Sequence, residues 1–101
     1  MQIAGNTMIN LANSGSYNGA VLEFLGAYTL TLAAGLPSGF SFAAIPPTSG
    51  VASIASDGTV LLQNGTGATA TTTVTRAASA NAMFAVQQRA SATNTYIVTG
   101  S

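Results

Sequence analysis

Residues 29–45 read TLTLAAGLPSGFSFAAI and contain two strand patterns with a turn between them. Leu30 and Leu32 alternate with threonines, and this period of two predicts a half-buried strand over 27–33. The next residues predict a turn, Gly35-Leu36-Pro37-Ser38-Gly39, because proline fixes φ and glycine allows backbone conformations that turns need. The second pattern predicts a strand at 40–45 that ends at two prolines, which cannot donate a backbone hydrogen bond to a sheet.

The same signals recur along the chain after residue 19. Short runs rich in β-branched and aromatic residues are separated by turn residues at intervals of about 8–12 residues. Asp57-Gly58 lies between two such runs, so we expect a β-hairpin there, and Asn64-Gly65 predicts another tight turn. A loop over 77–83 is favoured over a short turn of helix, which only the alanines support. The remaining predicted strands are 21–25, 51–56, 59–63, 69–77, 83–89 and 95–100.

This density of short strands predicts an all-β fold. We expect a small antiparallel β-sandwich, of the jelly-roll or β-tulip-like kind, with an irregular N-terminal arm. The arm is placed at 1–19 and the β-sandwich domain at 20–101. Two interpretations of residues 1–19 stay open, because Asn, Ser and Gly interrupt any period there. The segment is either an arm that lies along a partner or an edge strand near 7–11 followed by a loop.

Charge is nearly absent from this chain. Its 101 residues include two Lys or Arg, two Asp or Glu and no His, and their formal net charge is zero. An average domain carries about 25% charged residues. Without His or Cys, the chain has no Ser–His–Asp triad, no Cys–His pair and none of the usual zinc ligands. A carboxylate pair would have to consist of Glu23 and Asp57, so we expect no enzymatic activity, no cofactor and no metal site.

The same composition disfavours nucleic-acid and membrane partners. Phosphate binding needs Lys and Arg, and two Arg balanced by two acids form no basic patch. Residues 24–56 are uncharged, but prolines and glycines break them up well short of the roughly 20 apolar residues that a spanning helix needs. The N-terminus has neither the basic region nor the apolar run of a secretory signal. We therefore expect no nucleic acid, no membrane and no small-molecule substrate.

Neutrality favours assembly with other subunits. Net charge near zero promotes association, and a chain of about 100 residues buries a limited share of its surface alone. The threonine-rich run at 69–75 could present hydroxyls to ice or sugars. Such a site needs a flat array over several strands, and only this run shows the pattern in the sequence. A solvated or neighbour-packed strand face is therefore the preferred interpretation.

Four features together resemble small β-rich domains of tailed bacteriophages. They are the run 29–45, Gly50, the pair Asn64-Gly65 and the closing TYIVTG at 95–100. Such domains occur in capsid decoration (cement) proteins and in head or tail fibres. The resemblance consists of packing and turn residues, and Tyr96 stands where such domains often carry Trp. It implies a trimeric β-rich knob on a virion.

A capsid role is favoured over a fibre role, since the sequence contains no shaft or long coiled coil. We expect a bacteriophage capsid decoration protein, a homotrimer on the outer capsid surface of the virion. It would dock on the major capsid protein and stabilise the shell. The alternative is a head- or tail-fibre adhesion domain that binds host surface glycans through Tyr and Asn side chains. The candidate residues of the arm that contact the capsid or a neighbouring subunit are Gln2, Ile3, Met8, Ile9 and Leu11.

Overall fold

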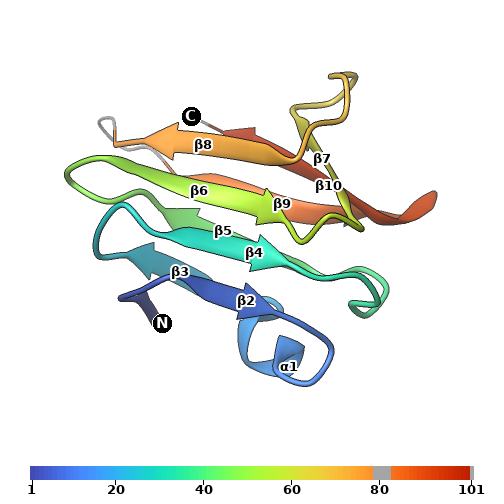
Figure 1. The fold of residues 1–101 in the computed structure, drawn as a ribbon, viewed down its shortest axis with the longest axis horizontal. Coiled ribbons are helices and arrows are strands. Elements are labelled where there is room, and N and C mark those ends of the chain that lie inside the picture. The colour runs from blue at the N-terminus through green and yellow to red at the C-terminus, as the bar shows by residue number, and fades with distance from the viewer. Residues whose placement is uncertain (79–82, 101) are drawn as a thin grey trace.

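Two β-sheets packed face to face make up most of the molecule (Figure 1). The computed structural model describes residues 1–78 and 83–100, so most of the predicted loop at 77–83 lies outside the described residues. Sheet A has the strand order β1-β3-β5-β9-β10-β7, and sheet B has the order β2-β4-β6-β8. The strands are β1 (Gln2–Ile3), β2 (Thr7–Ile9), β3 (Val21–Phe24), β4 (Thr29–Leu32), β5 (Ser41–Ile45), β6 (Val51–Ser56), β7 (Leu61–Asn64), β8 (Thr73–Ala77), β9 (Phe84–Arg89) and β10 (Ala92–Gly100), and the helix α1 spans Ser14–Tyr17.

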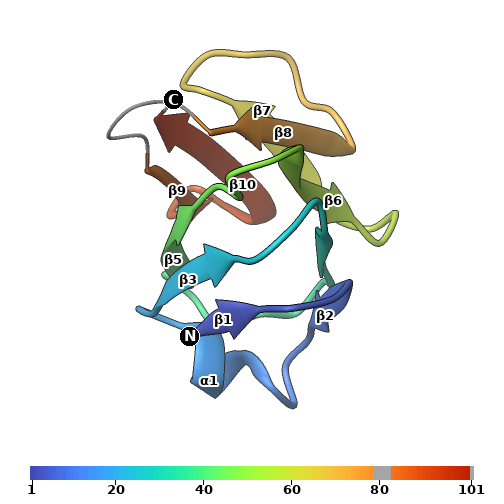
Figure 2. The same cartoon turned by 90° about the vertical axis from the view of Figure 1, so that its left-hand side faces the viewer.

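The first six strands wind as a coil with one strand in each sheet per turn. The chain crosses from sheet A to sheet B and back after every strand, as Figure 2 shows in a view along the strands. Strands that meet within a sheet are therefore separated by a full turn and run in the same direction. In sheet A, Ile3 lies beside Phe24 and Leu22 lies beside Ala44, while Ile9 lies beside Leu32 in sheet B.

This arrangement confirms the all-β prediction and corrects the antiparallel one. The pairs β1–β3, β3–β5, β2–β4, β4–β6 and β7–β10 are parallel, while β5–β9, β6–β8 and β9–β10 are antiparallel. Both sheets are consequently mixed. The alternating apolar pattern marks which side chains face the core, but it is the same for a parallel and an antiparallel neighbour.

The hairpin predicted at Asp57-Gly58 is wrong. The turn is present, but β6 belongs to sheet B and β7 to sheet A, so the chain crosses the core edge instead of reversing within one sheet. The Ser56 hydroxyl donates to the Val60 carbonyl at 2.7 Å and accepts the Gly58 N–H at 2.9 Å. Val60 is buried between the two strands. An Asp-Gly pair specifies the tight turn, and the burial of Val60 carries the chain over to the opposite sheet.

The C-terminal part is built mainly from antiparallel neighbours. Strands β9 and β10 form a hairpin that runs from Arg89 beside Ala92 to Phe84 beside Gly100. Asn94 takes a φ of 64° at the irregularity in this pairing. Outside the named strands, Leu62 and Thr71 exchange backbone hydrogen bonds of 3.0 and 2.7 Å. This bridge joins β7 of sheet A to the segment that enters β8 of sheet B.

The N-terminal segment is not an irregular arm. Strands β1 and β2 form the edges of sheets A and B, and α1 follows them at the same end of the molecule (Figures 1 and 2). The edge-strand interpretation is therefore the correct one for residues 7–9. Asn13 and Asn10 hold the connection to α1, because each side-chain oxygen accepts the backbone N–H of the other residue. The sequence pattern failed here because strands of two and three residues are too short to show a period.

The core lies between the two sheets and takes its side chains from alternate positions of every strand. Leu30, Leu32, Phe40 and Phe42 are all buried, as their pattern predicted. Phe40 packs edge-on against both Phe42 and Tyr96, with ring centroids 6.0 and 6.4 Å apart. Every buried side-chain nitrogen or oxygen in the described residues has a hydrogen-bond partner.

Candidate functional site

The five residues predicted to contact a partner divide into buried and exposed members. Ile3 and Ile9 are 2% and 0% exposed and belong to the core, so they cannot contact a partner in this fold. Met8 and Leu11 are 48% and 65% exposed, and Gln2 is exposed on the edge strand β1. The three exposed residues lie at the β1/β2 end of the molecule. Gln2 lies on the outer side of sheet A and Met8 on the outer side of sheet B, so they form no single patch.

The two carboxylates do not converge. Glu23 lies on the outer side of β3, while Asp57 lies in the turn between β6 and β7. The Thr59 hydroxyl and backbone N–H both donate to the Asp57 carboxylate, and these bonds lower its pKa below the usual value. Asp57 therefore stabilises its own turn. Among the described residues, no three His, Cys, Asp or Glu side chains gather in a way that would hold a metal ion.

The two arginines bind neutral groups of the fold. Arg76 on β8 donates to the Gly100 carbonyl at 2.9 Å and to the Asn64 side-chain oxygen at 2.6 Å, so it joins sheet B to β10 and β7 of sheet A. Arg89 donates to the Gln63 side-chain oxygen, also at 2.6 Å. These bonds place both guanidinium groups in structural roles between strands.

The outer side of sheet B consists mainly of short, uncharged side chains. The register aligns Thr29, Ser53 and Thr75 in one row across β4, β6 and β8. A second row contains Thr31, Ala55 and Thr73, and Met8 adjoins it on β2. The sequence showed a threonine pattern only at 69–75. Thr29 and Thr31 are far from this run in the sequence, and only the pairing of β4 with β6 and of β6 with β8 aligns them with Thr75 and Thr73. A prediction of the parallel register would have been needed to find this surface.

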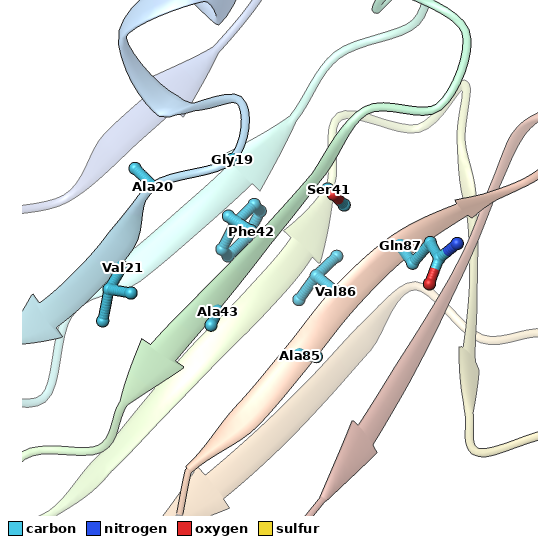
Figure 3. A pocket seen from close by; sticks show the side chains of 9 residues that line it. All are labelled: Gly19, Ala20, Val21, Ser41, Phe42, Ala43, Ala85, Val86 and Gln87. Atoms are coloured by element: carbon cyan, nitrogen blue, oxygen red, sulfur yellow. The ribbon is translucent and has the colours of Figure 1, made fainter.

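The outer side of sheet A is more apolar and less even. The register places Val21, Ala43 and Ala85 in one row across β3, β5 and β9. A hollow of about 270 Å³ opens on this side (Figure 3). It is lined by Gly19, Ala20, Val21, Ser41, Phe42, Ala43, Ala85, Val86 and Gln87.

Comparisons with known proteins identify no relative. No protein-family model, no curated protein and no solved structure matches the chain. The resemblance to tailed-phage proteins therefore stays a prediction. None of the helices in the described part of the chain has the length and apolar character needed to cross a membrane.

Proposed function

We propose that this chain is a bacteriophage capsid decoration protein, a homotrimer that docks on the major capsid protein at the outer surface of the virion. The observation that carries the proposal is the scarcity of charge on both broad faces. The strand positions on the outer side of sheet B are all uncharged, and those on sheet A include only Glu23 and Arg89. Charged residues keep small free domains soluble, whereas the centres of protein interfaces are depleted of them.

The proposed activity is mechanical. A trimer that touches several capsid subunits binds the assembled shell better than it binds free subunits, and so stabilises the shell by linkage. Three weak contacts held in one molecule act together, because the second and third form at a high effective concentration. The half-exposed Met8 and the exposed Leu11 at the β1/β2 end are the candidate shell contacts on each subunit.

Co-sedimentation with shells tests this function. The purified protein is mixed with decoration-free shells of the phage that encodes it, and the shells are then heated. We expect the protein to sediment with the shells and to raise the temperature at which they open. Met8→Asp and Leu11→Asp should each weaken sedimentation, since each places a charge in an apolar contact. Thr66→Asp, at an exposed position beyond β7, is the matched control and should bind as the unchanged protein does.

A protein that stays in the supernatant at every concentration, and leaves the opening temperature unchanged, would contradict the proposal. Equal binding by the Met8 and Leu11 variants would remove the β1/β2 end as the contact.

A glycan-binding adhesion domain is the second candidate. The rows of hydroxyls on sheet B favour it, since carbohydrate recognition uses side-chain hydroxyls as donors and acceptors. The positions of the tyrosines disfavour glycan binding. Tyr96 is fully buried, and Tyr17 and Tyr28 pack against the core, so the three rings form no open surface on which a sugar could stack. Binding to a glycan array, weakened by Thr75→Ala, would support this candidate over the first.

A further inference from the structure

We propose that the outer face of sheet A is the surface through which copies of this chain pack against one another. The inference deepens the homotrimer part of the proposed function by naming its interface. The face consists of the outward positions of β1, β3, β5, β9, β10 and β7, and we call it the A face.

Four of the eight large apolar side chains that the described residues leave exposed lie on the A face or at the ends of its strands. Val21 on β3 and Leu61 on β7 are 48% and 51% exposed. Leu25 and Met83 continue the outward alternation at the ends of β3 and β9 and are also about half exposed. Ile45 and Ile97 add half-buried surface between them. The outer side of sheet B has only Met8 and Val51 in this class, and its middle is threonine and serine.

The shape of the A face suits contacts in which one part of the A face on one copy meets a different part of the A face on the next copy, as a ring of three requires. At its middle, Ala43 lies beside Ala85, and these two short side chains line the hollow (Figure 3). Val21 on β3 and Gln87 on β9 also line it, and both are exposed. One face thus holds both a depression and projecting aliphatic side chains. Close packing at an interface needs such projections to fill such depressions, and copies of the same chain supply both.

The charge distribution and the size of the A face also fit another copy of this chain as the partner. Glu23 and Arg89, the two charged residues of the A face, lie in different rows, with the uncharged rows of Ala43–Ala85 and Ser41–Gln87 between them. Identical copies therefore meet over the middle without like-charge repulsion. The molecule measures 33 × 30 Å across its broad faces, which leaves room for the roughly 800 Å² that each partner buries in a stable interface of standard size. Assembly through the A face leaves the hydroxyl rows of sheet B in contact with water.

A charge placed in the hollow tests the inference. Ala85→Arg puts a guanidinium on the exposed middle of the A face, and Thr75→Arg puts the same group on the exposed middle of sheet B. Sedimentation equilibrium at micromolar concentration should give the unchanged protein and the Thr75 variant a mass of about 30 kDa, three times the 10.0 kDa of one chain. Ala85→Arg should sediment as a folded monomer, with the circular dichroism spectrum of the unchanged protein.

Thiol accessibility provides a second measurement that does not depend on disrupting the assembly. The chain contains no cysteine, so a single introduced thiol reports on its own position. In the assembled protein, the thiol of the Ala85→Cys variant should react with a soluble disulfide reagent at least about tenfold more slowly than that of Thr75→Cys. Dilution to the monomer should remove the difference.

The outcomes separate this inference from the proposed function. An unchanged protein that is monomeric, or an Ala85→Arg variant that assembles normally, would overturn the inference, as would loss of assembly in Thr75→Arg alone. Failure to sediment with shells bears only on the decoration function, because an assembly that Ala85→Arg dissolves still establishes the A face as the interface.

Discussion

The coil of β1 to β6 and the C-terminal strands β7 to β10 reach the same two sheets by different routes. In the coil, residues that lie side by side are far apart in sequence: Gln2 pairs with Glu23, and Thr29 pairs with Ser53. In the C-terminal part, the turn that follows Arg89 brings it directly beside Ala92. Contacts between residues that are close in sequence form early and at low entropic cost. Contacts between neighbouring strands of the coil form only after the chain segment between them, one full turn of the coil, has closed. The two regions share one core, so we expect them to unfold together despite this difference.

The largest effect is expected from an apolar deletion in the middle of the coil. Leu30 is fully buried and lies between Thr7 on β2 and Ile54 on β6. Leu30→Ala should lower the free energy of unfolding by about 2–5 kcal/mol, because it removes buried methyl groups and leaves a cavity. Urea unfolding measures the loss, with the exposed Thr75→Ala as control and an expected change below about 1 kcal/mol. Amide exchange should show the same loss in β9 and β10, and protection that persists there would divide the molecule into two independent units.

A glycine in the coil should give the next largest effect. Gly50 has a φ of +81°, and a Cβ added there would lie 2.8 Å from the Cβ of Ala27, in the preceding turn of the coil. Gly35 has nearly the same φ, +83°, and open space around it. Both Gly→Ala variants should lose about 1–2 kcal/mol from the left-handed backbone, and Gly50→Ala should lose a further 1–3 kcal/mol, roughly, from crowding.

Thermal or urea unfolding of the two variants, side by side, isolates the contact between coil turns. Ala27→Gly should recover the extra loss in Gly50→Ala, since it removes the atom that clashes. Equal losses of stability in Gly35→Ala and Gly50→Ala, with no recovery from Ala27→Gly, would show that adjacent turns of the coil are not in close contact at Gly50.

The smallest effect concerns a buried polar pair in the C-terminal strands. The Gln88 amide donates to the Tyr96 hydroxyl at 3.2 Å, and both side chains are almost completely buried. Tyr96→Phe should cost about 1 kcal/mol at neutral pH, near the net value of one hydrogen bond. Burial also raises the pKa of Tyr96 above its usual value near 10, although the bond from Gln88 opposes the shift.

This shift makes the Tyr96 contribution dependent on pH. The folded state holds the phenolic proton more tightly than the unfolded state, so the contribution is complete below pH 10 and falls as the pH rises through the folded-state pKa. The stability of the unchanged protein should therefore approach that of Tyr96→Phe in alkaline solution. Urea midpoints between neutral pH and pH 11, roughly, measure this convergence; parallel curves would contradict it.

The sequence predicted strand positions better than strand neighbours. The predicted strands at 51–56 and 27–33 correspond to β6 and to the shorter β4, and within the predicted strand 83–89 the side chains of Phe84 and Val86 face the core. The parallel coil was missed because the offset between paired residues changes along it: Ile3 pairs with Phe24, whereas Leu32 pairs with Ser56. A drifting offset leaves no fixed repeat in the sequence.

The candidate surfaces depended on this missing information. Of the predicted contact residues, Met8 and Leu11 are exposed, whereas Ile3 and Ile9 are also apolar and are buried. Only the pairing of β1 with β3 and of β2 with β4 distinguishes them. Similarly, Ala43 and Ala85 have short side chains, and they line one hollow because β5 and β9 are neighbours in sheet A.

Arg76 has a consequence for the way in which copies of this molecule can join. Sheet B ends at β2 on one side and β8 on the other, and edge strands invite another chain to extend the sheet. Beside β8, however, the Arg76 guanidinium donates to the carbonyl of Thr75 at 3.0 Å while it also holds Gly100 of β10. An incoming strand would have to displace this side chain before pairing. Arg76 therefore hinders the addition of another chain at the β8 edge of sheet B.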